Sequence, residues 1–466
     1  MAHFRIGVIA PLIFFVQLSR ADSVSASIDR YLQDVIKAKE TPGISVAVCR
    51  NGKPIYQKGF GYAELQNSVR ATSKTVYRIG SVTKQFTSAI IMQLEREGKL
   101  GLDDPASKYI DGLPPTWSKV TIRHLLTHTS GIPSYTNLPN FLEQFSHKSA
   151  VPKDILNTVI DKPLEFEPGS KWEYNNTGYV MLGMVIEKVD GRPYGKSLHA
   201  RIIDPLGMTQ TFFTSEQTVV PNRAQGYTWG QKGFDNSSFI NMDWPYAAGS
   251  MESTVEDLAK WDAALYTEKI LPVTSWKQVW TPYVLSTGVN SKYGFGWIVD
   301  KRDGVDYVEH GGGINGFTCG IKRIVSKGLT IIVLTNSETA DPNGNATKIA
   351  GLVDPSLKPK VVASASDSDP AMTKAARELF AGALQGNLDR TKLTPECSKQ
   401  ISPEMVAQVH EKLSSIGKLT TFELMSDSSK DGLRTRTYLA KIGARDFKIK
   451  FVTNAKGLIE DIDISR

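Results

Sequence analysis

The sequence has 466 residues, of which 41% are hydrophobic, and a formal net charge of +7. This length exceeds one ordinary small domain and predicts one large and one small domain with a full apolar core. Its lysines and arginines are scattered rather than gathered in a stripe with aromatic residues, which argues against a nucleic-acid-binding protein.

The first 21 residues are typical of a secretory signal. A positive charge at Arg5 precedes an apolar run over 6–18, and the stretch ends with Ser19, Arg20 and the small residue Ala21. The apolar run is shorter than the roughly 20 residues that span a membrane. We therefore expect cleavage near Ala21 and an exported chain, periplasmic or secreted, with no membrane span after processing.

The cysteines and histidines show no metal-binding pattern. Cys49, Cys319 and Cys397 are odd in number and far apart, so buried free thiols are expected. His124 and His128 lie four residues apart, but they lack a third ligand or the adjacent glutamate of a metalloprotease. The sequence predicts a structural role for both histidines, and neither a metal nor a cofactor.

The expected elements run from a helix over 25–39 to a hairpin of strands over 44–49 and 55–62. Helices are then predicted from Ser81 to Gly98, around 121–130, over 179–189 and over 253–265, and strands over 293–299, 307–310, 318–325 and 329–335. Strands thus bracket a long helical region. The predicted fold class is α+β, with an antiparallel sheet built from N- and C-terminal strands and flanked by helices.

The composition of the C-terminal part indicates a boundary between two domains. The stretch 352–370 is rich in Pro, Ser, Lys and Asp without a hydrophobic period, which predicts a linker after a main domain over 25–351. The remainder, 371–466, carries two helical segments followed by strand-like ones, which indicates a small α+β accessory domain. It shows no obvious catalytic residues, so a lid, a partner site and a stabilising cap all remain open.

A candidate nucleophile lies where a loop opens into the helix after Gly80. Ser81 and Lys84 are three residues apart and share one helix face. A serine hydroxyl must lose its proton while it attacks, and an amine can accept that proton if its proton affinity is lowered. The same spacing recurs at Ser415 and Lys418, so the motif by itself does not identify a site.

Two further patterns carry suitable chemistry. Tyr174 and Asn176 precede a helix, where a phenol that relays protons, given a neighbouring cation to lower its pKa, lies close to an amide that can hold a carbonyl. Tyr135 begins a second Tyr-x-Asn. His310, Gly311 and Gly312 end a strand, where glycines leave room for a substrate and for a backbone N–H to reach a carbonyl oxygen.

Taken together and in this order, the patterns resemble a known family. The chain is similar to the serine β-lactamase and penicillin-binding-protein-like hydrolases, in the branch related to class C β-lactamases that includes esterases and D-aminopeptidases. The resemblance covers roughly residues 27–337 and rests on four stretches, Gly80-Ser81-Val82-Thr83-Lys84, His124-Leu125-Leu126-Thr127-His128-Thr129-Ser130-Gly131, Tyr174-Asn175-Asn176-Thr177-Gly178-Tyr179 and His310-Gly311-Gly312.

The resemblance implies a role for each matched residue. Ser81 would be the acylated nucleophile, Lys84 and Tyr174 the pair that handles protons, and Asn176 the residue that holds the substrate carbonyl. The backbone N–H groups of Ser81 and Gly313 would form the oxyanion hole. It also implies acyl-enzyme chemistry without a cofactor, on a small-molecule or peptide substrate.

One departure from the family pattern bears on the substrate. His310 and Gly312, implied to bind substrate, stand where the family often has Lys-Thr-Gly. A lysine can attract a substrate carboxylate, whereas a histidine is largely neutral at pH 7. The sequence therefore favours an esterase or amidase, including one for D-amino-acid peptides, over a β-lactamase or penicillin-binding carboxypeptidase.

Two other functions remain as alternatives. The first is a catalytically silent member of the fold that binds peptidoglycan or another protein. The second is an α/β-hydrolase, which the absence of a Gly-x-Ser-x-Gly motif disfavours. The sequence makes no prediction of oligomeric state.

Overall fold

The computed structural model describes residues 10–213, 217–230, 232–302, 304–359, 365–414, 417–443 and 445–465. The chain divides into two compact units. The first comprises Met1–Thr228 and Phe234–Pro359, and the second comprises Trp229–Gly233 and Lys360–Arg466.

A seven-stranded sheet forms the centre of the first unit, and its strand order is β3-β2-β1-β11-β10-β9-β8. Its strands are β1 (Gly43–Arg50), β2 (Lys53–Glu64), β3 (Val69–Arg70), β8 (Ile298–Arg302), β9 (Val305–Ile314), β10 (Phe317–Ile324) and β11 (Leu329–Thr335). Neighbouring strands pair antiparallel, and β1 from the N-terminal part pairs with β11 from the C-terminal part. The predicted α+β class and its composite antiparallel sheet are thereby confirmed.

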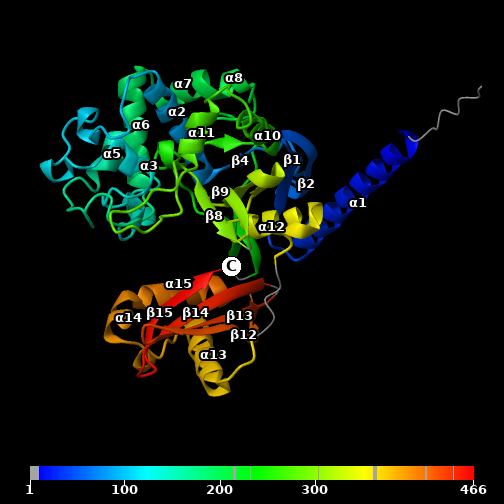
Figure 1. Ribbon diagram of the computed structural model, residues 1–466, viewed down its shortest axis with the longest axis vertical. Coiled ribbons are helices and arrows are strands. Elements are labelled where there is room, and N and C mark those ends of the chain that lie inside the picture. The colour runs from blue at the N-terminus through cyan, green and yellow to red at the C-terminus, as the bar shows by residue number, and fades with distance from the viewer. Residues whose placement is uncertain are drawn as a thin grey trace, which may run out of the picture. The chain divides into compact units, whose positions relative to one another are not determined.

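The sheet is buried on both faces, and successive residues of β1 alternate between two cores. Ala47 and Cys49 join the core shared with the helical region, whereas Val46 and Val48 join the core under two other helices. Those two helices are α1 (Ala10–Lys37) and α12 (Pro342–Val353). The helical region and this helix pair therefore cover opposite faces of the sheet (Figure 1).

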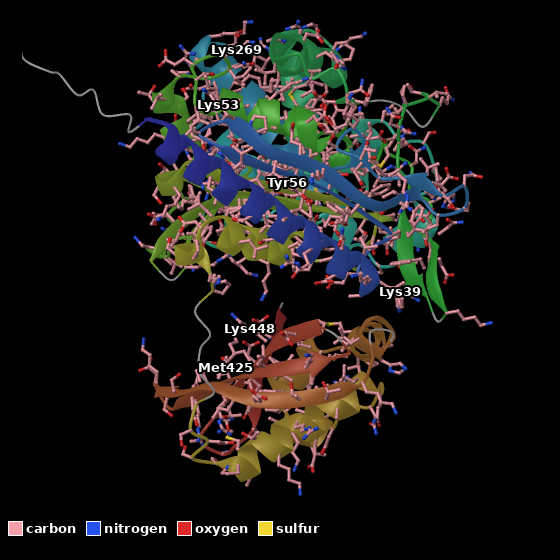
Figure 2. All side chains as sticks on the ribbon, turned by 90° about the vertical axis from the view of Figure 1, so that its right-hand side faces the viewer. Lys39, Lys53, Tyr56, Lys269, Met425 and Lys448 are labelled. Carbon is pink, nitrogen blue, oxygen red and sulfur yellow. The ribbon has the colours of Figure 1, made fainter. Side chains whose placement is uncertain are left out.

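Helix α1 is longer than the predicted helix over 25–39, because it begins at Ala10 and ends at Lys37. The predicted signal over 1–21 thus falls partly in this helix and partly on residues 1–9, which lie outside the described residues. Within the described chain, no helix is long and apolar enough to cross a membrane. Figure 2 shows Tyr56 of β2 beside α1, where its hydroxyl donates a 2.7 Å hydrogen bond to Asp29.

The helical region lies between the two groups of strands. Its α-helices are α2 (Thr83–Arg96), α3 (Ile122–Leu126), α4 (Phe141–Gln144), α5 (Pro152–Asn157), α6 (Asn176–Asp190), α7 (Tyr194–Leu198), α8 (Asp204–Leu206), α9 (Tyr246–Gly249), α10 (Val255–Ala264) and α11 (Val273–Val279). Two small sheets accompany them, formed by β4 (Tyr77–Arg78) with β7 (Glu252–Ser253) and by β5 (Tyr227–Gly230) with β6 (Gly233–Asn236). Side chains of Thr121, Asn175 and Thr254 cap α3, α6 and α10, and thereby fix where these helices begin.

Two other predicted stretches also differ in the structure. The strand predicted over 293–299 is wrong for its first part, since β8 begins only at Ile298. Gly296 has φ +76°, and a Cβ there would lie 2.7 Å from the Lys84 carbonyl oxygen, so this stretch is a turn packed against α2. The first part of the stretch predicted as a linker is ordered structure, because α12 continues to Val353 and Leu357 is buried in the core beneath it.

The second unit has a four-stranded antiparallel sheet in the order β12-β13-β14-β15. Its elements are α13 (Pro370–Leu384), α14 (Pro395–Gln400), α15 (Pro403–Ser414), β12 (Leu419–Lys430), β13 (Leu433–Ile442), β14 (Arg445–Thr453) and β15 (Ile459–Ser465). Alternate strand residues such as Tyr438, Ala440 and Ile449 are fully buried and pack with Phe380 of α13. The three cysteines of the chain are free and buried, as predicted.

Candidate active site

Ser81 lies in a tight 3₁₀ turn, Gly80–Val82, that precedes α2 and packs against β9. Gly80 has φ +48°, and a Cβ there would lie 3.0 Å from the backbone nitrogen of Gly313. A Cβ on Gly312 would lie 2.0 Å from the Ile79 carbonyl oxygen. Glycine is therefore required at both positions for the serine turn to approach the strand this closely, and Ser81 remains partly exposed.

The Lys84 side chain is fully buried behind Ser81. Its Nζ lies 3.0 Å from Ser81 Oγ, 2.9 Å from Asn176 Oδ1 and 2.8 Å from the Ala248 carbonyl oxygen. Burial lowers the pKa of the Lys84 amine well below its ordinary value of 10.5. The site therefore favours the neutral amine.

The three contacts of Lys84 match the bonding capacity of that neutral amine. An amine carries two hydrogens and one lone pair, and two of its neighbours, Asn176 Oδ1 and the Ala248 carbonyl, can only accept hydrogens. Once they take both, the lone pair faces the third neighbour, the Ser81 hydroxyl. This is the arrangement that a general base needs to remove a proton from a serine.

Tyr174 lies beside this pair, with its ring centroid 4.9 Å from Lys84 Nζ. The side chain is partly exposed, but its hydroxyl oxygen is buried and makes no hydrogen bond of good geometry to any residue that the structure describes. Burial raises the pKa of the phenol, and the nearby Ser81 hydroxyl opposes this only in part. Lys84 therefore does not supply the positive charge that was expected to lower the pKa of the Tyr174 phenol. The phenol stays protonated, so it can donate a proton but cannot act first as a base.

Replacing Tyr174 by phenylalanine tests this position. We expect the turnover of an ester substrate to fall by about 10²-fold or more, because a proton donor is lost. The midpoint of thermal unfolding should stay equal or rise slightly, because the deleted hydroxyl is buried and makes no hydrogen bond of good geometry within the described part of the chain. Unchanged turnover in the folded variant would remove Tyr174 from the proton path.

Asn176 opens α6 and is held from two sides. Its Oδ1 accepts from Lys84, its Nδ2 donates to Thr136 Oγ1 at 3.2 Å, and its backbone N–H donates to Ser134 Oγ at 3.1 Å. An amide nitrogen carries two hydrogens, so the second Nδ2 hydrogen can reach a substrate carbonyl. The structure thus brings Ser81, Lys84, Tyr174 and Asn176 into one cluster.

The His310 ring is 3% exposed. Its Nδ1 donates to the Gly311 carbonyl at 2.5 Å, so its Nε2 accepts from the Tyr293 hydroxyl at 2.8 Å. Burial lowers the pKa of His310 to about 3. The neutral ring is therefore occupied at both nitrogens, and the accessible part of this stretch is the backbone of Gly311, Gly312 and Gly313.

His128 is buried beneath the loop that carries Tyr174 and Asn175 and contacts both residues. It is 1% exposed, and its Nδ1 accepts a 3.1 Å hydrogen bond from the backbone N–H of Asn175. Its ring centroid lies 4.3 Å from that of Tyr174 and 4.6 Å from that of Tyr293. His128 therefore has the structural role that the sequence predicts, and it lies directly against the candidate site. Its hydrogen bond to Asn175 involves a backbone N–H, so the sequence pattern could not reveal this contact.

The Ala248 carbonyl is a member of the site that the sequence did not reveal, because any residue supplies such an atom. It is positioned by α9, whose first residue, Tyr246, has φ +40°, a conformation costly for a residue with a Cβ. Thr87 Oγ1 donates to the Ala247 carbonyl at 2.7 Å. A Cβ on Gly183 of α6 would lie 2.4 Å from the Tyr246 ring.

Gly183→Ala should therefore displace α9 and weaken the hold on the lysine amine. We expect kcat to fall about tenfold, which corresponds to roughly 1.4 kcal/mol of transition-state stabilisation. Gly178→Ala on the same helix is the matched control, because a Cβ there meets no atom closer than 3.5 Å. Equal turnover by the two variants would show that α9 does not position Lys84.

The remaining sequence candidates fall outside this cluster. Tyr135 is buried and donates its hydroxyl to the Trp244 carbonyl at 2.9 Å, and Ser415 lies outside the described residues. The Nδ1 of His124 accepts from the Thr121 backbone N–H at the start of α3. In the described part of the chain, no three residues among His, Cys, Asp and Glu are grouped to hold a metal ion.

Comparison with known proteins gives one consistent result. Residues 28–353 match the family model described as Beta-lactamase. Penicillin-binding protein 4* of Bacillus subtilis (strain 168) is 31% identical over 310 residues, which are 63% of this chain and 68% of that protein.

Solved structures show the same fold. The D-amino acid amidase from Ochrobactrum anthropi SV3 is 26% identical with a TM-score of 0.63, and the match covers 72% of this chain and 99% of that one. The octameric penicillin-binding protein homologue from Pyrococcus abyssi has a TM-score of 0.62 at 24% identity, a likeness of fold alone. That match covers 94% of this chain and 98% of the other, so it extends into the second unit.

Proposed function

Since the chain belongs to the beta-lactamase family, as its sequence patterns predicted, we propose that it is an exported serine hydrolase that cleaves an ester or amide bond through an acyl-enzyme on Ser81. The observation that carries this proposal is the buried Lys84 amine, held by two carbonyl oxygens so that its lone pair faces the Ser81 hydroxyl.

In the acylation step, the Ser81 proton passes to Lys84 Nζ while Ser81 Oγ bonds to the substrate carbonyl carbon. The oxygen that becomes negative is stabilised by the backbone N–H groups of Ser81 and Gly313, and the Asn176 amide holds the neighbouring part of the substrate. Tyr174 donates its proton to the leaving oxygen or nitrogen and takes the proton held by Lys84. The alcohol or amine departs, and both side chains are neutral again.

Deacylation repeats these transfers with water. A water proton passes to Lys84, the water oxygen bonds to the acyl carbon, and Ser81 Oγ leaves and recovers a proton. The products are one carboxylic acid and one alcohol or amine. Each proton transfer of this kind contributes about 10²–10⁴-fold, and an oxyanion donor about 10²–10³-fold.

The buried, neutral His310 indicates which substrates the proposed hydrolase prefers. A neutral ring with both nitrogens engaged offers no charge to a substrate carboxylate. We therefore propose esters and amides without a carboxylate, including D-amino-acid amides, as the substrate class. A β-lactamase or penicillin-binding carboxypeptidase is less well supported, because those substrates carry a carboxylate.

A matched substrate panel tests this preference. The substrates are p-nitrophenyl butyrate, mono-p-nitrophenyl succinate with its terminal carboxylate, D- and L-phenylalanine amide, and a chromogenic cephalosporin. We expect kcat/KM for the butyrate to exceed that for the succinate, and turnover of the cephalosporin to be slower still. Cephalosporin hydrolysis at rates that rival the butyrate would contradict the preference, and no turnover of any substrate would favour the silent binding protein.

A further inference from the structure

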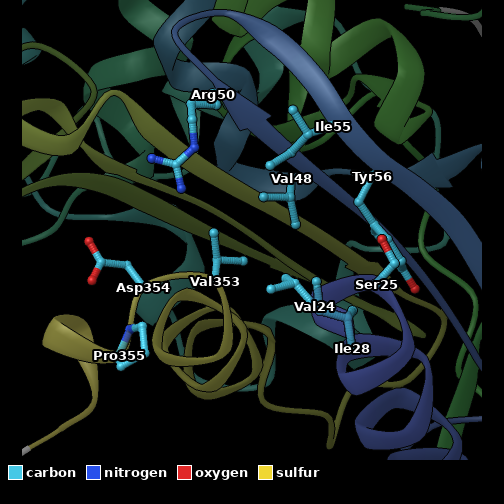
Figure 3. Close-up of a pocket in the computed structure, with 10 residues that line it drawn as sticks. All are labelled: Val24, Ser25, Ile28, Val48, Arg50, Ile55, Tyr56, Val353, Asp354 and Pro355. Atoms are coloured by element: carbon cyan, nitrogen blue, oxygen red, sulfur yellow. The ribbon is translucent and has the colours of Figure 1, made fainter. Parts of the chain in front are cut away.

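A pocket lies on the face of the sheet opposite α2, between α1, the β1–β2 hairpin and the end of α12 (Figure 3). Its volume is about 560 Å³, within the range typical of small-molecule sites. It is lined by Val24, Ser25, Ile28, Val48, Arg50, Ile55, Tyr56, Val353, Asp354 and Pro355. The proposed hydrolysis uses none of these residues.

The lining combines an apolar wall with one available cation. Val48, Ile55 and Val353 contribute aliphatic surface, and Figure 3 shows the Arg50 side chain extending from β1 toward Val353. No residue in the described part of the chain forms a hydrogen bond or ion pair with the Arg50 guanidinium. A guanidinium with unused donors beside apolar surface matches an anion that carries an apolar chain.

The other charged group of the pocket is already satisfied. Asp354 lies 3.3 Å from Lys327 Nζ and accepts from the backbone N–H and the hydroxyl of Ser356. It therefore has little need of a ligand cation. Its negative charge also disfavours a dianion such as phosphate more than a single carboxylate.

We propose that this pocket binds a small carboxylate with a medium-length aliphatic chain. The carboxylate pairs with the Arg50 guanidinium, and the chain covers Val48, Ile55 and Val353. Tyr56 closes one side of the pocket, where its hydroxyl is held by Asp29. This site is separate from Ser81 and does not depend on the proposed hydrolysis.

Calorimetric titration tests the proposal on the full chain carrying Ser81→Ala, so that its outcome is independent of turnover at Ser81. The probes are butanoate, hexanoate, octanoate and octan-1-ol. We expect one site per chain, with a Kd for octanoate below about 1 mM. Affinity should rise about threefold to fourfold per added CH₂ up to octanoate. Octan-1-ol should bind at least tenfold more weakly, because it offers Arg50 no charge.

Two variants locate the site, and one serves as a control. Arg50→Gln should weaken octanoate binding at least tenfold, and Val353→Trp should block it by filling the pocket. Arg30→Gln changes an exposed arginine of α1 that does not line the pocket and should leave Kd unchanged. Absence of saturable binding to the Ser81→Ala chain overturns the proposal, as does octanoate binding that neither pocket variant weakens.

Discussion

Replacing Lys84 by methionine is expected to lower kcat for ester hydrolysis by about 10³-fold or more while the protein remains folded. Methionine preserves much of the length of the side chain, but it has no lone pair of comparable basicity to accept the Ser81 proton. The Lys418→Met variant is the matched control, because it changes the second Ser-x-x-Lys motif of the chain. Turnover by Lys84→Met within tenfold of the unchanged protein would contradict the assigned base.

The same substitution has a pH-dependent effect on stability. Because the pKa of Lys84 is lowered in the folded state, the unfolded chain binds more protons than the folded one below pH 10.5. The folded protein with lysine therefore loses stability as pH falls from 10.5 toward the folded pKa. The free energy of unfolding of Lys84→Met minus that of the unchanged protein should therefore be larger at pH 6 than at pH 9. Equal differences at the two pH values would show that Lys84 is protonated in the folded state.

Acid is expected to destabilise the first unit steeply below pH 6.5. Burial lowers the pKa of His310 to about 3 and that of His128 well below 6.5. Both rings are neutral when folded, but they gain protons in the unfolded chain below about pH 6.5. Stability is therefore fully present above pH 6.5 and is lost as pH falls, by up to about 1.4 kcal/mol per pH unit for each ring.

Urea unfolding followed by tryptophan fluorescence between pH 6.5 and 5 measures this loss. His310→Gln should reduce the pH slope by about 1.4 kcal/mol per pH unit, and the exposed His147→Gln should leave it unchanged. A slope that His310→Gln does not reduce would show that this ring is already protonated in the folded protein.

Much of the sheet could be predicted because its central strands are short apolar runs bounded by turn residues. Turn residues 51 and 52 separate β1 from β2, and β11 is buried at every position, as is typical of a central strand covered on both faces. The strand prediction for 293–297 was wrong because the aromatic residues of this stretch pack around a glycine turn and do not form the hydrogen-bonded pairs of a β-strand. In this turn Gly296 closely approaches the backbone of α2. Such a tertiary contact cannot be recognised from the local sequence.

The candidate site was predictable where it depends on side-chain type. Ser81, Lys84, Tyr174 and Asn176 were each visible as a short pattern, and the fold brings them together. The direction of the Tyr174 pKa shift was not visible, because it depends on burial. Nor was the Ala248 carbonyl, because a backbone acceptor is independent of sequence and its place is set by the strained Tyr246.

Trapping the acyl-enzyme is the most direct test of the central claim. The protein is mixed with p-nitrophenyl butyrate, quenched in acid within milliseconds to seconds, and its intact mass and peptide masses are measured. A butyryl adduct on the peptide that contains Ser81, absent from Ser81→Ala and strongly reduced in Lys84→Met, is the predicted result. Rapid hydrolysis by Ser81→Ala, or an adduct on another residue that turns over at the catalytic rate, would contradict the claim.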